Sequence, residues 1–208
     1  MIFTLERVAG PYVEPVTLAE MRRHLRVYDD ITTEDDDITG LISAARAWVE
    51  DYTGRALVDQ TWRLTVGDYV PTDTTGLIIG QLPLSAQGIP LRRSPIIAVT
   101  SVASVDADNV ETVIAASEYQ LRQADSKWPH LVGLDATTTL RITYRAGFAA
   151  GLGSPDPTPD LALVPERFKQ AMKLWAEAMY DRDERMMEKL LMAAEAVIRP
   201  ERVNIQFA

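Results

Sequence analysis

The chain has 208 residues, of which 47% are hydrophobic, so it can bury one sizeable core with at most one appended subdomain. Its 21 Lys and Arg residues against 30 Asp and Glu residues give a net charge of −9, which argues against a protein whose main task is to grip nucleic-acid phosphates. It has no cysteine, and this excludes disulfides, thiolate metal sites and cysteine nucleophiles.

We expect no targeting or membrane segment. Residues 1–7 lack a basic region followed by a long apolar run, so no signal peptide is predicted. No apolar stretch approaches the roughly 20 residues that span a bilayer. The protein is therefore expected to stay in the compartment where it is made.

The first predicted helix covers residues 18–26. Thr17 and Glu20 have the spacing of a capping box, in which two side chains satisfy free amides at a helix start. Residues 27–34 contain Asp and Thr residues that favour a turn, so this helix is expected to be short.

A longer second helix is predicted to begin near Asp36 or Asp37. Gly54 is the residue type preferred just past a helix C-terminus, and it marks the expected end. Between these points the apolar residues keep the spacing of one helical face: Ile38, Leu41, Ile42, Ala45, Trp48, Val49 and Tyr52.

The period of the hydrophobic residues changes after Leu57, where branched and aromatic residues alternate with polar ones. Gly, Pro, Asp and Asn separate the short runs, and residues 106–109 are expected to form a hairpin turn. Several short strands at this spacing predict a small antiparallel sheet, sandwich or barrel. The candidate strands are 61–66, 77–79, 89–92, 98–105, 112–115, 119–122 and 139–144.

Helical structure is predicted to resume toward the C-terminus. Residues 147–164 form a loop rich in Gly and Pro, and a helix begins at Pro165, where the missing amide costs nothing. A bend is expected near residues 182–184, and Pro200 is expected to end the helix. The tail that follows has the alternation of a strand that adds to a partner sheet, at Val203, Asn204, Ile205, Gln206 and Phe207.

The fold class predicted by this order of elements is α+β. It is mainly a helical bundle, made of two N-terminal helices and long C-terminal helices, with an inserted antiparallel β region. The expected parts are an N-terminal helical segment at 1–56, a β-rich region at 57–147, a Pro/Gly-rich loop at 148–164, C-terminal helices at 165–199 and an extended tail at 200–208.

The sequence contains no strong signal for a metal or catalytic site. Asp29, Asp30 and the run at 35–37 gather carboxylates, but the glycine and spacing of a calcium loop are absent. This pattern favours a helix start stabilised by acidic groups. His24 and His130 are the only histidines, and neither belongs to a ligand motif. We predict no catalytic residue, no metal ligand and no cofactor.

Three further features are interpreted as structural. Trp48 and Trp175 lie on apolar helical faces and are expected in the core rather than as platforms for nucleic-acid bases. The pair Arg92 and Arg93 fits a solvated strand end better than a phosphate contact. Residues 151–154 follow a strand as a phosphate loop does, but the prolines after them forbid the helix start that such a loop needs.

Six segments, in this order, are spread over most of the length of the chain: Pro15-Val16-Thr17-Leu18, Asp37-Ile38 to Gly54-Arg55, Arg93-Ser94-Pro95-Ile96 to Ser101-Val102, Tyr119 with Trp128-Pro129, Ile142-Thr143-Tyr144 to Gly147-Phe148, and Val164-Pro165-Glu166-Arg167 to Gln170-Ala171. Together they resemble tailed-phage head-to-tail connector proteins, the adaptor family that docks under the portal ring. They also resemble the adaptors of phage-like gene transfer particles. Each segment is degenerate alone, and the order and spacing carry the resemblance.

The resemblance implies a structural virion protein and not an enzyme. It implies a homo-oligomeric ring of twelve subunits in the neck of a phage or phage-like particle, assembled in the bacterial cytoplasm. The partners implied are the portal ring above and a tail-side stopper or tail terminator protein below. DNA would pass through the lumen without sequence recognition, and the acidic balance suits a wall that does not hold phosphates.

Members of this family commonly anchor on the portal with the C-terminal end. The resemblance therefore implies that the matching exposed segment binds the portal and becomes ordered on binding. Its residues are Arg199, Pro200, Glu201, Arg202, Val203, Asn204, Ile205, Gln206, Phe207 and Ala208. The loops at 70–76 and 124–130 are candidate contacts to the next tail component.

Two other hypotheses about the function remain open from the sequence alone. A DNA-packaging accessory or DNA-binding protein would use the N-terminal helices, but the first 55 residues hold 6 basic and 11 acidic side chains, a net of −5. A metal-dependent hydrolase would use the carboxylates at 35–37 and would need a pocket with converging polar groups.

Overall fold

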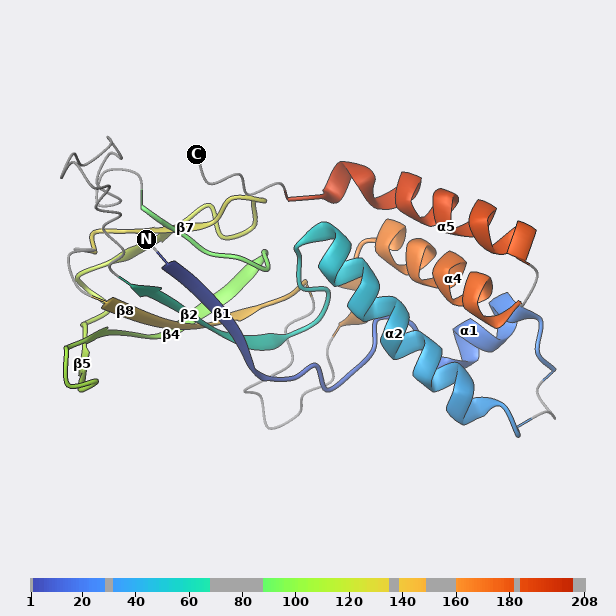
Figure 1. The fold of residues 1–208 in the computed structure, drawn as a ribbon, viewed down its shortest axis with the longest axis horizontal. Coiled ribbons are helices and arrows are strands. Elements are labelled where there is room, and N and C mark those ends of the chain that lie inside the picture. Colours follow the sequence, from blue (N-terminus) through green and yellow to red (C-terminus); the bar gives the residue numbers. More distant parts are fainter. Residues whose placement is uncertain are drawn as a thin grey trace, which may run out of the picture. The chain divides into compact units, whose positions relative to one another are not determined.

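The computed structural model describes residues 2–28, 32–67, 88–134, 139–148, 160–181 and 184–203. The chain forms two compact units. Residues 1–10 and 59–147 make the first, which we call the β unit, and residues 11–58 and 148–208 make the second, which we call the helical unit. Figure 1 shows the strands of one and the helices of the other.

The β unit is built on a five-stranded antiparallel sheet in the order β1-β2-β8-β4-β5. In β2 and β8 every second residue is buried, so one face of this sheet forms the core. Trp62 pairs with Tyr144 and Leu64 with Ile142 on that face. The strands are β1 (Ile2–Ala9), β2 (Gln60–Gly67), β4 (Ile96–Val105), β5 (Glu111–Val113) and β8 (Thr139–Ala146).

A smaller antiparallel sheet has the order β3-β7-β6. Its strands are β3 (Ile89–Pro90), β6 (Gln120–Arg122) and β7 (His130–Val132). Ile89 is the register partner of Leu131, and both side chains are buried, which fixes the register of these short strands.

The turn between β4 and β5 confirms the hairpin predicted at 106–109. The Asp106 carboxylate accepts hydrogen bonds from the amides of Asp108 (3.0 Å) and Val110 (2.8 Å). Asn109 adopts the left-handed conformation with φ of 63°, which Asn tolerates better than most residues.

The helical unit contains α1 (Leu18–Leu25), α2 (Asp35–Thr53), α4 (Glu166–Tyr180) and α5 (Glu184–Ile198), with 3-10 turns η1 (Leu161–Leu163) and η2 (Arg199–Glu201). Helix α4 packs against α1, α2 and α5 (Figure 1). Burying each large core side chain contributes about 1.5–3 kcal/mol. The core includes Val16, Met21, Ile38, Ile42, Val49, Phe168, Met172, Ala194 and Ile198.

The predicted capping box at the start of α1 is confirmed. The Thr17 hydroxyl accepts from the Glu20 amide (3.2 Å), and the Glu20 carboxylate accepts from the Thr17 amide (2.9 Å). That backbone hydrogen bond lowers the pKa of Glu20. At the end of α2, Gly54 takes the left-handed conformation (φ 71°) and donates its amide to the Glu50 carbonyl.

Arg46 and Glu50 lie within α2, are among the buried charged residues of the helical unit and pair with each other. The Arg46 guanidinium donates to Glu14 (2.8 Å) and to Glu50 (3.0 Å). The second oxygen of Glu50 accepts from the Leu57 amide (2.9 Å), so the same carboxylate also ties down the chain after α2. Burial without these partners would be strongly destabilising.

The α+β class is confirmed, and most predicted elements occur within a few residues of their expected bounds. Strands β1 and β7 were not predicted from the sequence. Pro200 lies within η2, and α5 already ends at Ile198. The candidate strand at 77–79, the loop at 70–76 and most of the Pro/Gly-rich loop, at 149–159, lie outside the described residues. Across the described ranges, no helix combines the length and apolar character needed to cross a membrane.

Candidate functional site

The acidic run at 35–37 forms the first turn of α2. Both Asp35 carboxylate oxygens accept from the Arg22 guanidinium (3.0 and 3.2 Å), while Asp36 and Asp37 are exposed in the first turn. In the part of the chain that is described, no group of three or more His, Asp or Glu side chains has metal-binding geometry. Asp29 and Asp30 lie outside that part.

Each histidine has a contact within its own unit. Nε2 of His24 lies 2.9 Å from a carboxylate oxygen of Glu177, which links α1 to α4. Nδ1 of His130 lies 3.2 Å from the carbonyl of Trp128 and braces the loop before β7. Neither contact places a nucleophile beside an imidazole, so the geometry is structural.

Arg92 and Arg93 hold the segment between β3 and β4 on the sheet. The buried Tyr144 hydroxyl donates to the Arg92 carbonyl (2.8 Å), and burial raises the pKa of Tyr144 above its ordinary value. The Arg93 guanidinium lies 4.9 Å from the Trp62 ring centroid, and that of Arg7 lies 6.0 Å from it. Arg93 is half-buried and lies over an aromatic ring, so it is less solvated than a free strand end would be.

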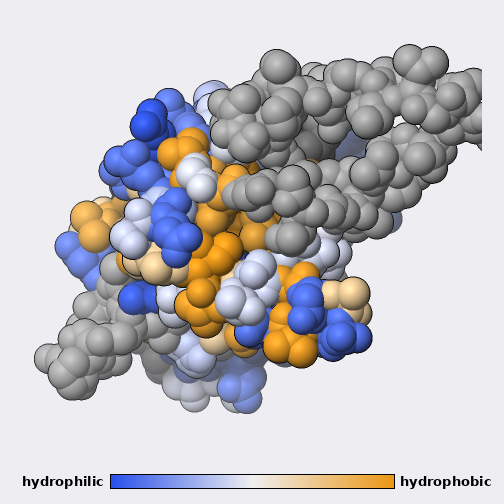
Figure 2. All heavy atoms as spheres, turned by 90° about the vertical axis from the view of Figure 1, so that its left-hand side faces the viewer, coloured by the Kyte–Doolittle hydropathy of each residue, from blue (hydrophilic) through white to orange (hydrophobic). Residues whose placement is uncertain are grey.

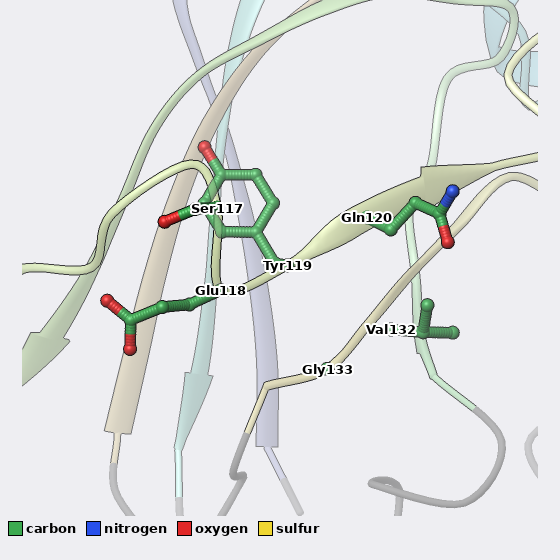
Figure 3. Close-up of a pocket in the computed structure, with 6 residues that line it drawn as sticks. All are labelled: Ser117, Glu118, Tyr119, Gln120, Val132 and Gly133. Carbon is green, nitrogen blue, oxygen red and sulfur yellow. The ribbon is translucent and has the colours of Figure 1, made fainter.

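A shallow hollow in the β unit is shown in Figure 3. The side chains of Glu118 and Gln120 extend in different directions, so they do not converge on one point. The backbone at Gly133 (φ 93°) passes so close that a Cβ there would lie 2.6 Å from the Glu118 carbonyl oxygen. The hollow lacks the converging polar groups that a catalytic pocket needs. Its lining is Ser117, Glu118, Tyr119, Gln120, Val132 and Gly133.

The first half of the candidate anchor is bound to the helical unit by three charged side chains. One oxygen of the Glu201 carboxylate accepts from Arg55 (2.6 Å), and the other accepts from Arg167 (2.6 Å). Arg55 follows α2, Arg167 lies in the first turn of α4, and Glu201 ends η2, so three distant parts of the sequence meet here. We call Glu201, Arg55 and Arg167 the Glu201 clamp.

Aromatic rings surround the buried part of this clamp. The side chain of Arg55 is only 6% exposed, and its guanidinium lies 4.7 Å from the ring centroid of Phe148 and 6.0 Å from that of Phe168. Burial lowers the pKa of Arg55, and the charge of Glu201 opposes that shift. The guanidinium remains charged, so Glu201 supplies the compensating charge at this site.

Residues 202 and 203 continue the attachment. The Val203 amide donates to the Thr53 carbonyl at the end of α2 (2.8 Å), and the Arg202 guanidinium lies 5.4 Å from the Tyr52 ring centroid. Glu201 and Val203 are therefore attached to the helical unit, whereas the side chains of Arg199, Pro200 and Arg202 are exposed, as expected from the sequence. Asn204, Ile205, Gln206, Phe207 and Ala208 lie outside the described residues.

Sequence reasoning did not find the clamp. Arg55 was recognised only as the residue after a helix-ending glycine, and Glu201 only as part of a tail. Arg55 and Glu201 are 146 positions apart. No local periodicity connects them, and only a signal that links distant positions would have revealed the pair.

The helical unit combines the Glu201 clamp with exposed helix faces. The clamp holds Glu201 against the helical unit, while one side of α2 and one side of α5 are exposed to solvent. Exposed helix faces of this kind suit a protein that assembles with other proteins. A family model described as "Phage gp6-like head-tail connector protein" matches residues 15–127. The chain belongs to this head–tail connector family, and the resemblance drawn from the sequence is confirmed.

Solved structures of similar fold extend the likeness to almost the whole chain. A chain in the neck of an empty gene transfer agent (GTA) particle computed with C6 symmetry is 25% identical, with a TM-score of 0.72, covering 99% of this chain and 98% of that one. A chain in the virion of a native GTA particle is 24% identical, with a TM-score of 0.69 and 98% coverage of both chains.

A third chain, from the neck of a native GTA particle computed with C12 symmetry, is 24% identical. Its TM-score is 0.68, and the alignment covers 99% of this chain and 98% of that one. The comparison with curated proteins finds no match.

Proposed function

We propose that this protein is a head–tail connector that forms a ring in the neck of a phage or phage-like particle. The observation that carries the proposal is the likeness to a neck chain, with a TM-score of 0.72 over 99% of this chain. Membership of the connector family supports the same role. In this role the protein binds the portal ring on one side and a tail component on the other, and catalyses no reaction.

The helical unit is proposed to build the ring and to carry the portal anchor. Within the expected anchor, Glu201 and Val203 are already engaged with Arg55, Arg167 and Thr53. Portal contact is therefore assigned to residues 204–208, together with the exposed side chains of Arg199, Pro200 and Arg202. The clamp sets the point from which the anchor leaves the helical unit.

The β unit is proposed to meet the tail-side protein. Figure 2 shows apolar surface between hydrophilic side chains on the side of the molecule that faces left in Figure 1. Exposed apolar side chains of this unit include Val113, which is 74% exposed, and Trp128, which is 49% exposed. Large aromatic residues at a surface are frequent anchors of protein interfaces. DNA would pass through the ring lumen without being read.

Negative-stain imaging with the isolated portal ring tests the proposal. Three chains are compared: the full length, one that ends at Val203, and one that ends at Ile198. We expect a collar on the portal with the full-length chain and none with the chain ending at Val203, although that variant keeps the clamp and should melt like the full length.

The chain that ends at Ile198 is the control, because it loses the clamp as well and should melt at a lower temperature. A collar with the chain ending at Val203 would move the anchor to another part of the molecule. A full-length chain that stays monomeric beside a naked portal ring would reject the connector function itself.

A further inference from the structure

One face of α5 is exposed and carries no acidic residue. The helix buries only Ala194 and Ile198 among its 15 residues, because it packs on one side against α4. At about 100° per residue, six exposed residues fall in one sector on the opposite side. We call them the α5 outer face: Arg185, Met186, Lys189, Met192, Ala193 and Ala196.

The α5 outer face exposes two large apolar side chains, Met186 and Met192. Met192 is 63% exposed and Met186 is 47% exposed, and they lie beside two basic residues. The acidic residues of α5, Glu184, Glu188 and Glu195, are confined to a different edge of the helix. Glu188 lies four residues before Met192, so the acidic edge adjoins the α5 outer face on one side. An exposed apolar surface rimmed by charged side chains is typical of a protein-binding face.

Helix α2 presents a face of opposite charge. Asp37, Gly40, Ala44 and Asp51 are exposed and align along one side of the helix, which we call the α2 ridge. The one basic residue of α2, Arg46, is buried and paired with Glu14 and Glu50. A Cβ added at Gly40 would meet nothing within 4 Å, so no neighbouring side chain covers the helix backbone in the middle of the ridge.

The two faces point away from each other. Helix α4 packs against both α2 and α5 (Figure 1), and each of those helices turns its buried residues inward. A cyclic ring needs each subunit to offer two different surfaces on nearly opposite sides, because neighbours in a large ring differ by a small rotation. The α5 outer face and the α2 ridge meet this requirement.

We propose that the α5 outer face of one copy docks on the α2 ridge of a second copy, and that repetition of this contact closes the ring. This inference rests on the proposed connector function. Similar chains lie in particle necks computed with C6 and C12 symmetry, which points to a second copy as the occupant. Lys189 and Arg185 then approach Asp37 and Asp51, and flexible methionines cover Gly40 and Ala44.

The chain has no cysteine, so single cysteines give an unambiguous cross-linking test. Full-length Met192→Cys and Ala44→Cys are mixed and treated with a short bis-maleimide, which spans more distance than a disulfide. We expect covalent dimers from the mixture and none from either variant alone. The double variant should give a ladder of covalent oligomers. Met192→Cys mixed with Val113→Cys, in the β unit, is the control and should give no product.

The reaction is run in solution and on collars assembled on the portal ring, with wild-type collars imaged in parallel. Collars whose Met192→Cys and Ala44→Cys sites link support the inference. Collars in which these sites do not link, or in which Met192→Cys links to itself, overturn the interface and leave the connector function standing. Absence of collars with wild-type protein rejects the connector function, and a monomer by light scattering then removes this interface as well.

Discussion

The Glu201 clamp shows how one carboxylate stabilises a buried arginine. The side chain of Arg55 is buried. Its guanidinium lies near the rings of Phe148 and Phe168, which carry no negative charge to balance it. Glu201 satisfies that charge and also bonds Arg167. Removing the carboxylate charge therefore deprives a buried cation of this ion-pair partner, a mechanism that accounts for many large losses of stability.

Glu201→Gln is expected to lower the free energy of unfolding by about 2–3 kcal/mol, somewhat less than full loss of a buried ion-pair partner because the amide still accepts a hydrogen bond. Urea denaturation followed by tryptophan fluorescence measures the change. Glu111→Gln is the matched control, because Glu111 pairs with Arg141 at the surface of the β unit and should cost less than about 1 kcal/mol. Equal losses for the two variants would show that the clamp is not a buried ion pair.

At the scale of single elements, helix α1 depends on its capping box. Thr17→Ala should lower the free energy of unfolding by about 1 kcal/mol, because the Glu20 amide loses its acceptor. Urea denaturation measures this loss.

The stability that Glu20 adds should depend on pH. Since the folded-state pKa of Glu20 is lowered, its contribution to the free energy of unfolding is present above the unfolded-state pKa and is lost as the pH falls through the folded-state pKa. Glu20→Gln should therefore weaken the protein at neutral pH and change little in acid, as thermal melts at both pH values would show.

The helix pair α2 and α4 is joined by aromatic stacking. The rings of Trp48 and Trp175 lie 6.2 Å apart, and both are only partly buried, whereas Phe168 is fully buried in the core. Phe168→Ala should cost about 3–5 kcal/mol, and Trp175→Ala less, about 2–3 kcal/mol. Denaturation midpoints of both variants check the order. A larger loss at Trp175 would mean that the stacked pair carries more of the helical core than its partial exposure implies.

For the whole molecule, the net charge of −9 opposes tight binding of DNA. We expect no retardation of duplex DNA in a gel at physiological salt, with either free protein or collars, because a channel wall that held phosphates would slow the genome. A mobility shift that weakens steeply as salt rises would instead favour a DNA-binding protein. A basic DNA-binding protein run on the same gel is the positive control, because its retardation of the duplex weakens as salt rises.

The sequence by itself determined the α+β class, the bounds of α1 and α2, the hairpin at 106–109 and the family, because capping residues, turn residues and hydrophobic periods act over a few neighbours. It did not reveal β1, whose partner β2 begins some fifty residues later, or β7, which is only three residues long. Only the tertiary structure decided that Glu201 belongs to a clamp with Arg55 and Arg167, and that α2 and α5 both pack against α4. Those relations depend on packing between residues far apart in the chain, which no local pattern encodes.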